Sequence, residues 1–409
     1  MTSASDYYPL QTNEAFPAPA SGGVIALEKL VLADFRNYAT LTLEAEAVPI
    51  ILTGPNGSGK TNLLEAISLL AAGRGLRGAP YGELVRHHAQ RGWAVHARVH
   101  GAEGKADIGT AWHVAGNGES AYRRARQVHI NGAKQKSSGA LAHHIRMLWL
   151  TPSMDRLFNG AVGDRRRFLD RLVIALDASH GVQVQLFEKL MRERNRLLSG
   201  EHPDRTWLSG LEKRMAEAGI AIAASRHATV KILSGFTASP ACTGLGEFTD
   251  FPCSRLKIAC VLNDMLTELS SGLAAEKYRS ILTKSRAGDA AAGRTLVGPH
   301  RSDLRVAHAG KEIDARLCST GEQKALLIGI ILAHARAIAR VTGGQAPVML
   351  LDEAVAHLDE TRRKGLFAAL NDMGVQAWMT GADIALFKAA FGMAKVFEVQ
   401  DGALGAGRV

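Results

Sequence analysis

The segment whose residue types and spacing best suit chemistry is a glycine-rich turn that matches the pattern G-x-x-x-x-G-K-[ST] throughout. It consists of Gly54, Pro55, Asn56, Gly57, Ser58, Gly59, Lys60 and Thr61. Glycines let the backbone curl so that several N–H groups converge on phosphate oxygens. The lysine of this pattern reaches the β and γ phosphates of a nucleotide, and the hydroxyl after it binds Mg²⁺. We therefore predict a nucleotide site, and a chance match in a glycine-rich turn is the alternative.

A second segment supplies the carboxylates that such a site requires. The apolar run at 347–351 ends in Asp352 and Glu353. A carboxylate at the end of a strand beside the phosphates can bind Mg²⁺, and its neighbour can accept a proton from the attacking water. We assign the first role to Asp352 and the second to Glu353. The alternative is a buried strand that simply ends in acids.

The elements around these motifs place them where the chemistry needs them. The apolar run at 48–53 predicts a buried strand before the loop, and the helical spacing of apolar residues predicts a helix over 61–72. Further strands are expected at 27–35, 41–46, 295–297, 303–308, 348–351, 375–379 and 396–399, with strand-like alternation in 93–114 and 121–130. Helices are expected within 165–236, over 261–286, and at 322–340 and 361–370. This alternation predicts an α/β protein with a parallel or mixed sheet.

Length and composition limit the class of protein. The chain has 409 residues, 46% of them apolar and 22% charged, and no apolar run approaches the roughly 20 residues of a membrane span. The polar start, 1–23, is expected to be a disordered leader and not a signal peptide. The four cysteines show no paired metal-ligand spacing, which predicts reduced thiols and a cytoplasmic protein without a metal–cysteine site: Cys242, Cys253, Cys260 and Cys318.

Positive charge is concentrated in one part of the chain. The net charge is +10, and residues 71–150 contain twelve Arg or Lys against four acids, together with eight histidines. A localised basic surface is what a protein needs to bind a polyanion such as DNA. We single out Arg123, Arg124 and Arg126 as candidate phosphate contacts. A solvated basic face is the alternative.

A third motif lies between the two halves of the nucleotide site. Ser319-Thr320-Gly321-Glu322-Gln323-Lys324 opens the apolar helix expected at 322–340, where a serine is most often only a helix cap. Leu358-Asp359 follows Glu353 at a short interval. This series resembles the signature, Walker B and D-loop motifs of ABC-type ATPases, in which the signature of one head contacts the γ phosphate bound by another. The resemblance implies an ATP-sandwiched homodimer in which Ser319, Gly321, Gln323 and Asp359 contact nucleotide.

The interval between the motifs and several further segments resemble one subfamily. Lys60 and Asp352 are 292 residues apart, more than in a transporter ATPase, and no coiled coil or zinc-hook CxxC intervenes. The chain resembles the bacterial RecF recombination-mediator family through segments 32–38 (LADFRNY), 54–57 (GPNG), 151–152 (TP), 165–170 (RRRFLD), 298–304 (GPHRSDL) and 319–324 (STGEQK).

That resemblance implies an ABC-type, SMC-like P-loop ATPase head, with a mixed sheet, an antiparallel β subdomain and an inserted helical lobe. We expect residues 24–150 and 293–409 to form the ATPase lobe and 151–292 the helical insertion. The implied function is binding of single-stranded, gapped or junction DNA and loading of recombinase in gap repair, replication restart and the SOS response. ATP with Mg²⁺ is the implied cofactor, slow DNA-dependent hydrolysis the implied switch, and RecR and RecO proteins the implied partners, with no membrane involved. A transporter motor and a non-hydrolysing DNA scaffold are the alternatives.

The sequence leaves the roles of several residues open. No glutamine stands at the position of a transporter Q-loop, where Leu150-Thr151-Pro152 occurs, and Thr380-Gly381 replaces the usual switch histidine. Arg36 is expected either to approach the phosphates or to pack on the sheet. Residues 165–167, three arginines, are expected to contact phosphate or a second copy, or else to form a solvated helix face. His300 and Arg301 are expected either to couple the helical lobe to the nucleotide or to form a hydrogen-bonded turn.

Overall fold

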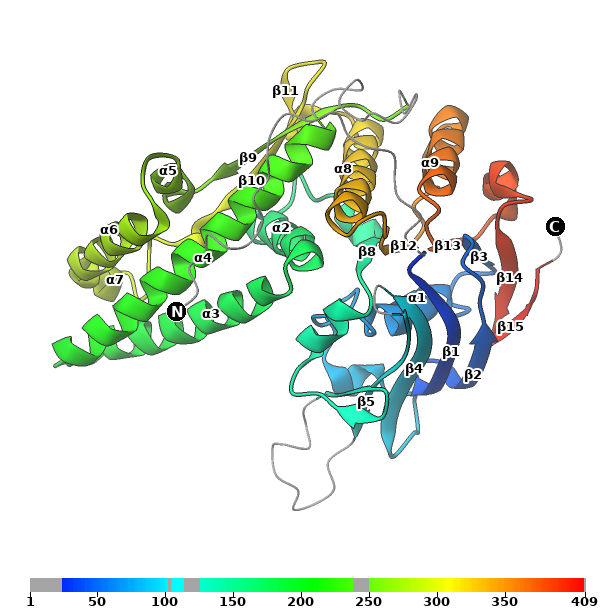
Figure 1. The fold of residues 1–409 in the computed structure, drawn as a ribbon, viewed down its shortest axis with the longest axis horizontal. Helices are drawn as coiled ribbons and strands as arrows, with labels where there is room; N and C mark the ends of the chain where they lie inside the picture. The colour runs from blue at the N-terminus through cyan, green and yellow to red at the C-terminus, as the bar shows by residue number, and fades with distance from the viewer. Residues whose placement is uncertain (1–23, 102–103, 114–125, 238–249, 408–409) are drawn as a thin grey trace.

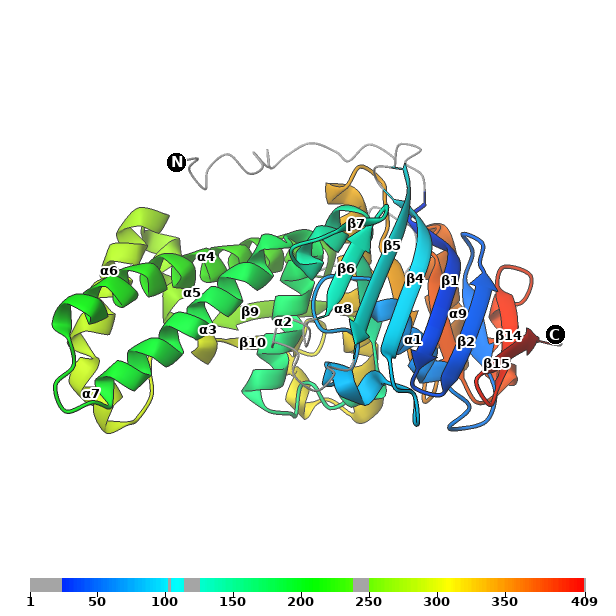
Figure 2. The same ribbon diagram turned by 90° about the horizontal axis from the view of Figure 1, so that it is seen from below.

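The protein has two packed sheets at one end and a helical lobe that extends away from them (Figures 1 and 2). The computed structural model describes residues 24–101, 104–113, 126–237 and 250–407. The leader expected at 1–23 lies outside these ranges. No helix in the described ranges has the length and apolar character that crossing a bilayer would require.

The first sheet carries the nucleotide motifs. Its strands are β3 (Ile50–Thr53), β8 (Met147–Leu150), β12 (Val348–Leu351), β13 (Ala377–Gly381), β14 (Lys395–Gln400) and β15 (Ala403–Ala406), in the order β15-β14-β3-β13-β12-β8. All neighbours are parallel except β14 and β15. Every residue of β3, β8, β12 and β13 is buried, as expected for parallel strands covered on both faces. The sequence predicts β3, β12, β13 and β14, but neither β8 nor β15.

The second sheet is antiparallel. It contains β1 (Ala26–Phe35), β2 (Tyr38–Glu44), β4 (Gly92–Gly101), β5 (Gly104–His113), β6 (Gln127–Ile130) and β7 (Ala133–Lys134), in the order β2-β1-β4-β5-β6-β7. Burial alternates along β4 and β5, so one face packs on the core and the other meets solvent. Helix α1 (Lys60–Ser68) contacts β1 of this sheet and β13 of the first. The helix that follows the phosphate-binding loop is therefore enclosed between two sheets.

The helical lobe is built from α2 (Val162–Leu176), α3 (Ser179–Leu198), α4 (Arg205–Thr237), α5 (Val261–Glu268), α6 (Ser271–Lys284) and α7 (Arg286–Ala291). A three-stranded sheet joins it, with β9 (Ser254–Ala259), β10 (Asp303–His308) and β11 (Ile313–Asp314). Strand β9 was not expected, and it pairs with β10 across the boundary expected at residue 292.

Two expectations for this lobe are wrong. The helix expected over 261–286 is broken at Leu269 and Ser270, which adopt extended conformations between α5 and α6. The strand expected at 295–297 does not form. Instead Thr295 and the Leu296 N–H donate hydrogen bonds to the side chains of Asn195 and Asp289. The apolar pattern there reflects packing of a loop on the lobe, which local alternation cannot distinguish from a strand.

Two further helices complete the chain. Helix α8 (Thr320–Val341) is buried along most of its length and contacts both β8 and α4, so it joins the sheets to the helical lobe. Helix α9 (Glu360–Asp372) is capped by the preceding residue, Asp359, whose carboxylate accepts a hydrogen bond from the Arg362 N–H. One apolar core runs through both sheets and α8, and a second lies inside the helical lobe between α3, α4, α5 and α6.

The helical lobe also encloses an ionic network around Arg194. This guanidinium is fully buried and donates hydrogen bonds to Glu212 (3.1 Å) and Asp289 (2.7 Å), whose side chains are buried as well. It also donates to the Leu282 carbonyl oxygen at 2.7 Å. Burial raises the pKa of Glu212, but hydrogen bonds from Arg286 and Arg194 outweigh that effect and hold it below its ordinary value. The network therefore ties α3, α4, α6 and α7 together.

We predict that Arg194→Met destabilises the helical lobe by about 3–5 kcal/mol, because it leaves buried carboxylates without their cation. Native-state hydrogen exchange of amides in α3, α4 and α7 measures this free energy of opening. The matched control, Arg192→Met on the exposed side of α3, removes only a 3.9 Å contact with Glu188 and should cost less than about 1 kcal/mol. Equal protection in the two variants would contradict the structural role of Arg194.

Candidate functional site

Strand order brings the two halves of the nucleotide motif to one edge of the first sheet. The phosphate-binding loop follows β3, Asp352 follows β12, and β13 lies between them. The register aligns Leu351 with Met379, and Thr53 with Gly381. All three strands are parallel, so their carboxyl ends coincide, which is where ligands bind in open α/β sheets.

The centre of the site is the carboxylate of Asp352. Its Oδ1 accepts a hydrogen bond from the Thr61 hydroxyl at 2.8 Å and another from the Thr380 hydroxyl at 2.8 Å. Asp352 and Thr380 are buried, with 5% and 1% of their surfaces exposed. A hydroxyl and a carboxylate are oxygen ligands of the kind that Mg²⁺ prefers. Thr61 and Asp352, predicted separately, therefore form one site that fits this ion.

Glu353 lies directly beside this centre. Its backbone has a positive φ of 48°, and its N–H donates to the Thr380 hydroxyl at 2.9 Å. Its carbonyl oxygen accepts from Lys324 Nζ at 3.4 Å, and the same Nζ contacts Asp155 at 3.4 Å. The Glu353 carboxylate makes no hydrogen bond or ion pair within the described ranges. It is therefore available to a ligand, as the predicted proton acceptor must be.

Lys60 is folded back onto the loop that it belongs to. Its Nζ donates to the carbonyl oxygens of Gly54 at 2.7 Å and Pro55 at 2.8 Å. Burial lowers the pKa of Lys60, and the carboxylates of Glu353 and Asp352 act in the opposite direction without cancelling it. A nucleotide phosphate would favour the charged form and replace these carbonyl contacts. The hydroxyl of Ser58, which is buried and has no partner within the described ranges, offers a further donor in the same loop.

The turn between β1 and β2 clamps the phosphate-binding loop from one side. Asn37 Nδ2 donates to the Ser58 carbonyl oxygen at 3.0 Å, and the Tyr38 hydroxyl donates to the Gly59 carbonyl oxygen at 3.0 Å. Gly59 has a φ of +117°, and a Cβ there would lie 2.4 Å from Asn37 Nδ2. Gly54 is equally constrained, since its Cβ would lie 2.3 Å from the Val399 carbonyl oxygen. The loop is thus held in its curled form by neighbours as well as by its glycines.

Arg36 forms hydrogen bonds with two neighbouring segments of the chain. Its guanidinium donates two hydrogen bonds to the buried carboxylate of Glu65 on α1, at 2.9 and 3.2 Å, and a third to the Glu83 carbonyl oxygen at 2.9 Å. Arg36 is therefore bound to α1 in this structure, and its approach to the phosphates stays a prediction. Asn37 and Tyr38, which sequence reasoning did not assign to the site, are the residues of this turn that contact the loop.

The signature segment forms the first turn of α8. Ser319 and Glu322 form a capping box: the Ser319 hydroxyl accepts from the Glu322 N–H at 3.3 Å, and the Glu322 carboxylate accepts from the Ser319 N–H at 3.0 Å. Hydrogen bonds from Lys311 and Ser319 hold the pKa of Glu322 at about 2. Ser319 remains exposed, and nothing lies within 4 Å of where a Cβ of Gly321 would project. The helix-cap role is therefore real, and this turn is still open to a ligand.

Two other residues that are expected to contact nucleotide form hydrogen bonds within the chain. Gln323 is 3% exposed, donates to the Cys318 carbonyl oxygen at 2.9 Å and accepts from Asn159 at 3.3 Å. Asp359 caps α9 and also lies 3.4 Å from Arg362. Gln323 thus positions the signature turn, whereas Asp359 is exposed and remains accessible.

Ion pairs absorb much of the charge in the basic window. Exposed or half-buried basic residues on and beside the antiparallel sheet pair with acids: Arg77 with Glu65, Arg86 with Asp34, Arg98 with Asp107, and Lys105 with Glu28. Arg126 donates to the carbonyl oxygens of Leu69, Ala71 and Gly73, which makes it a structural residue of the turn after α1. Arg123 and Arg124 lie outside the described ranges. Arg74, Arg91, Lys134 and Lys136 are exposed and make no ion pair within those ranges.

The three arginines of α2 have separate roles. Arg165 is buried and forms two hydrogen bonds with Asp303, at 2.7 and 3.1 Å, while Arg166 donates to the Ser302 carbonyl oxygen at 3.1 Å. Arg167 is exposed and pairs with Asp164. Neither a row of phosphate contacts nor a uniformly solvated face describes them, since two of the three anchor α2 to the strand β10 region. His300 likewise contacts the Thr295 carbonyl oxygen at 2.9 Å within the expected turn.

Metal binding by protein side chains alone finds no support in the described ranges. They contain no group of three or more His, Cys, Asp or Glu residues arranged to hold an ion. Cys253, Cys260 and Cys318 form no disulfide bond within the described ranges, and Cys242 lies outside them. A magnesium site made of Thr61, Asp352 and the phosphates of a nucleotide is consistent with this finding.

Comparisons with known proteins agree with the nucleotide site seen in the structure. The chain matches the family described as the RecF/RecN/SMC N terminal domain over residues 26–404. The relatives named DNA replication and repair protein RecF from Rhizobium leguminosarum bv. trifolii and Agrobacterium fabrum are 47% and 48% identical over 378 and 381 residues. These alignments cover 92% and 93% of this chain and 98% of each relative.

Solved structures of RecF proteins also match nearly the whole of this chain. The recombination mediator protein RecF of the RecFOR pathway, solved with ATPrS and with ATP, superposes with TM-scores of 0.78 and 0.79 at 26% and 25% identity. These matches cover 93% and 94% of this chain and 98% of each RecF chain. Together with the phosphate-binding loop, the acidic strand end and the signature turn, they show that the chain belongs to the RecF family of DNA replication and repair ATPases.

Proposed function

We propose that this protein is a DNA-binding repair ATPase that forms a dimer around Mg²⁺–ATP and uses slow, DNA-dependent hydrolysis to release DNA. The observation that carries the nucleotide role is the hydrogen-bonded triad of Thr61, Asp352 and Thr380 beneath the phosphate-binding loop. Family membership sets aside the transporter motor, and an available carboxylate on Glu353 argues against a scaffold that cannot hydrolyse ATP.

Each residue of the site has a distinct task in this proposal. The loop N–H groups and Lys60 bind the phosphates, while Thr61 and Asp352 would hold Mg²⁺, which neutralises phosphate charge when bound. Glu353 accepts the proton of the attacking water. Thr380 fixes both acids, because its hydroxyl donates to the Asp352 carboxylate and accepts from the Glu353 N–H. It occupies the strand end where related ATPases place a switch histidine.

DNA, a homodimer and RecR and RecO proteins are the partners that we propose on the basis of the family. The solved RecF relatives are described as mediators of the RecFOR pathway. No base-reading motif is evident in the sequence, so we propose recognition of gapped or single-strand/double-strand junction DNA by shape. Recombinase loading, replication restart and the SOS response are the processes that this activity would serve. A cytoplasmic location is part of the same proposal.

We predict that Lys60→Met and Glu353→Gln separate ATP binding from hydrolysis. Lys60→Met should weaken ATP binding at least tenfold, since it removes the cation that contacts the phosphates. Glu353→Gln should keep ATP affinity within about threefold of the wild type but lower the hydrolysis rate by 10²–10⁴, the contribution typical of a general base. Equilibrium binding of a fluorescent ATP analogue and phosphate release measure the two properties. The assignment fails if both variants lose the same ATP affinity.

We predict that the signature turn acts on the nucleotide of a second chain. Ser319→Arg should leave ATP binding by the monomer nearly intact but prevent ATP-dependent dimerisation and hydrolysis, because an exposed arginine side chain would fill the turn. Thr342→Arg, at the other end of the same helix, is the control. Sedimentation with ATP and with ADP measures the dimer, which only ATP should support.

Mixing two variants tests whether this contact acts in trans. A heterodimer of Ser319→Arg and Lys60→Met contains one site with an intact loop and an intact signature turn. Sedimentation should show heterodimer with ATP, and hydrolysis should return in part. If Ser319→Arg dimerises with ATP like the wild type, Ser319 is only the cap of α8.

We predict that the exposed cations at the edge of the antiparallel sheet, which have no ion-pair partner among the described residues, contribute to DNA affinity. Lys134→Ala with Lys136→Ala should flatten the dependence of log affinity on log salt by up to about 1.8, or 0.9 for each duplex phosphate released. Arg98→Ala with Lys105→Ala, which removes two ion-paired cations, is the control and should change the slope less. Binding of gapped duplex at several salt concentrations gives both slopes, and an unchanged slope in the first variant removes this edge from the interface.

A further inference from the structure

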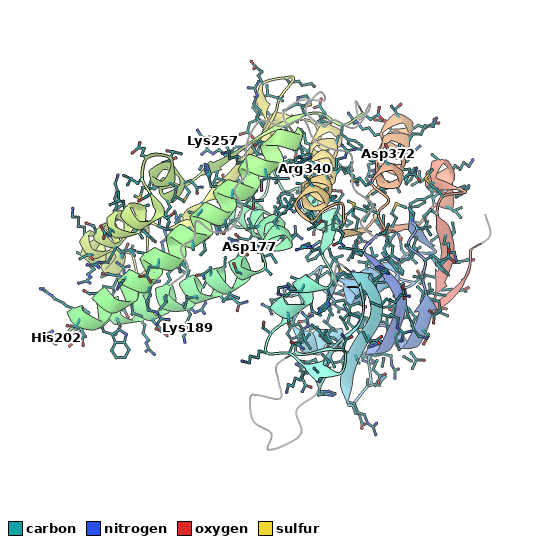
Figure 3. The ribbon with its side chains drawn as sticks, in the orientation of Figure 1. Asp177, Lys189, His202, Lys257, Arg340 and Asp372 are labelled. Carbon is teal, nitrogen blue, oxygen red and sulfur yellow. The ribbon has the colours of Figure 1, made fainter. Side chains whose placement is uncertain are left out.

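The helical lobe has a cavity of about 440 Å³ that the ATPase mechanism does not use. It lies where β9 and β10 meet the start of α5 and the loop before residues 299–301. Three cationic side chains line it, Lys257, Arg301 and Arg305, together with the apolar residues Val261, Leu296 and Val297. Figure 3 labels Lys257 on this side of the lobe, away from the nucleotide sheet. The cavity is therefore a separate site.

The cationic side chains that line the cavity have no ion-pair partner among the described residues, whereas the neighbouring charged residues do. Lys257 and Arg305 are directly opposite each other on the antiparallel strands β9 and β10, and both are exposed. Like charges in this position destabilise a strand pair. Neither makes a hydrogen bond or ion pair with any side chain that the structure describes, and the same holds for Arg301.

The adjacent charges on these strands are all paired. Arg255 pairs with Glu312 at 2.9 Å, and Asp303 pairs with Arg165 at 2.7 Å. Arg305 also influences Asp314, but the pKa of that carboxyl is lowered mainly by its hydrogen bond from Arg316. Asp264 is the acid among the lining residues. Three cations and one acid leave the cavity with a formal charge of +2, which an anionic ligand would neutralise.

The apolar wall indicates what kind of anion fits. Val261 and Leu296 are 52% and 40% exposed, although both are large aliphatic side chains at the rim of a concave site. A nucleic-acid backbone would meet the cations through phosphate and leave these side chains in water. A peptide that carries a carboxylate next to an apolar side chain satisfies both parts of the surface.

We propose that this cavity binds an acidic segment of a partner protein. A carboxylate lies between Lys257 and Arg305, and an adjacent apolar side chain packs on Val261 and Leu296. The opposed cations are then bridged, so the repulsion built into the β9–β10 pair is relieved when the partner binds. Charge complementarity gives the orientation, and the apolar contact gives selectivity over free phosphate or simple acids.

Peptide display against the full-length chain tests this chemistry directly. Random 12-residue peptides are selected on the wild type and depleted on Lys257→Glu/Arg305→Glu. The selected sequences should combine at least two acidic residues with a neighbouring aliphatic or aromatic residue. A fluorescently labelled synthetic copy of the commonest one should bind the wild type at least tenfold more tightly than the charge-reversed variant.

Two further variants distinguish a docked peptide from general attraction. Lys213→Glu/Arg214→Glu makes the same charge change at two exposed positions of α4 in the same lobe. This variant should retain peptide affinity within about twofold. Leu296→Ser keeps every charge and should still weaken binding several-fold. Hydrogen exchange of β9 and β10 confirms that each variant is folded. A peptide that binds both charge-reversed variants equally, or no enrichment of acidic sequences, overturns the proposal.

DNA is the competing ligand, and the same variants identify it. If Lys257→Glu/Arg305→Glu weakens binding of a short duplex much more than Lys213→Glu/Arg214→Glu does, and Leu296→Ser does not change it, the cavity contacts the DNA backbone. That result, without acidic peptide binding, also overturns the proposal. It leaves the proposed ATP-dependent function intact, because nucleotide binding and dimerisation are measured separately.

Discussion

The functional part of the molecule depends on one oxygen atom, Oδ1 of Asp352, which accepts hydrogen bonds from hydroxyls on two different elements. Thr61 comes from the helix after β3, and Thr380 comes from β13. These residues can meet only if β3, β13 and β12 are parallel neighbours in that order, as the sheet has them. A register change of one residue would turn Asp352 to the other face. The complete burial of these strands fixes the register, and so the apolar core determines the geometry of the phosphate site.

A second contact connects this site to the signature helix within one chain. Lys324 lies on the first turns of α8, is 5% exposed, and contacts both the Glu353 carbonyl oxygen and Asp155 at 3.4 Å. The signature turn, the end of β12 and the segment after β8 therefore share one buried cation. Because α8 also packs against α4, this helix connects the helical lobe to the backbone of Glu353. The Glu353 backbone at this connection has a positive φ, which is a costly conformation for a residue other than glycine.

The sequence predicts the local parts of this arrangement and not the long-range ones. The loop from Gly54 to Thr61 and the strand before Asp352 are recognisable because each is a short pattern with its own periodicity or glycine spacing. Strands β8 and β9 were missed because each owes its conformation to a partner more than 40 residues away. The partners that Arg36 and Gln323 have within the chain, Glu65 and the Cys318 carbonyl oxygen, could not be predicted from the sequence, and the proposed contacts of these two residues with nucleotide stay predictions. Thr380 gave a signal only as a departure from the expected histidine, and its partners became visible only in three dimensions.

The distribution of ion pairs shows why a count of charged residues does not locate an anion-binding surface. The window 71–150 contains eight more arginines and lysines than acids, but four of these cations pair with acids, and Arg126 donates its hydrogen bonds to carbonyl oxygens. The two acids opposite Lys105 and Arg86 lie on β1, outside the window, so a count within it overstates the free charge. Around the cavity beside β9 and β10, by contrast, three cations have no acidic partner among the residues that the structure describes. Binding to an anion requires cations whose charge is not already neutralised within the chain, and pairing, not abundance, determines where these are.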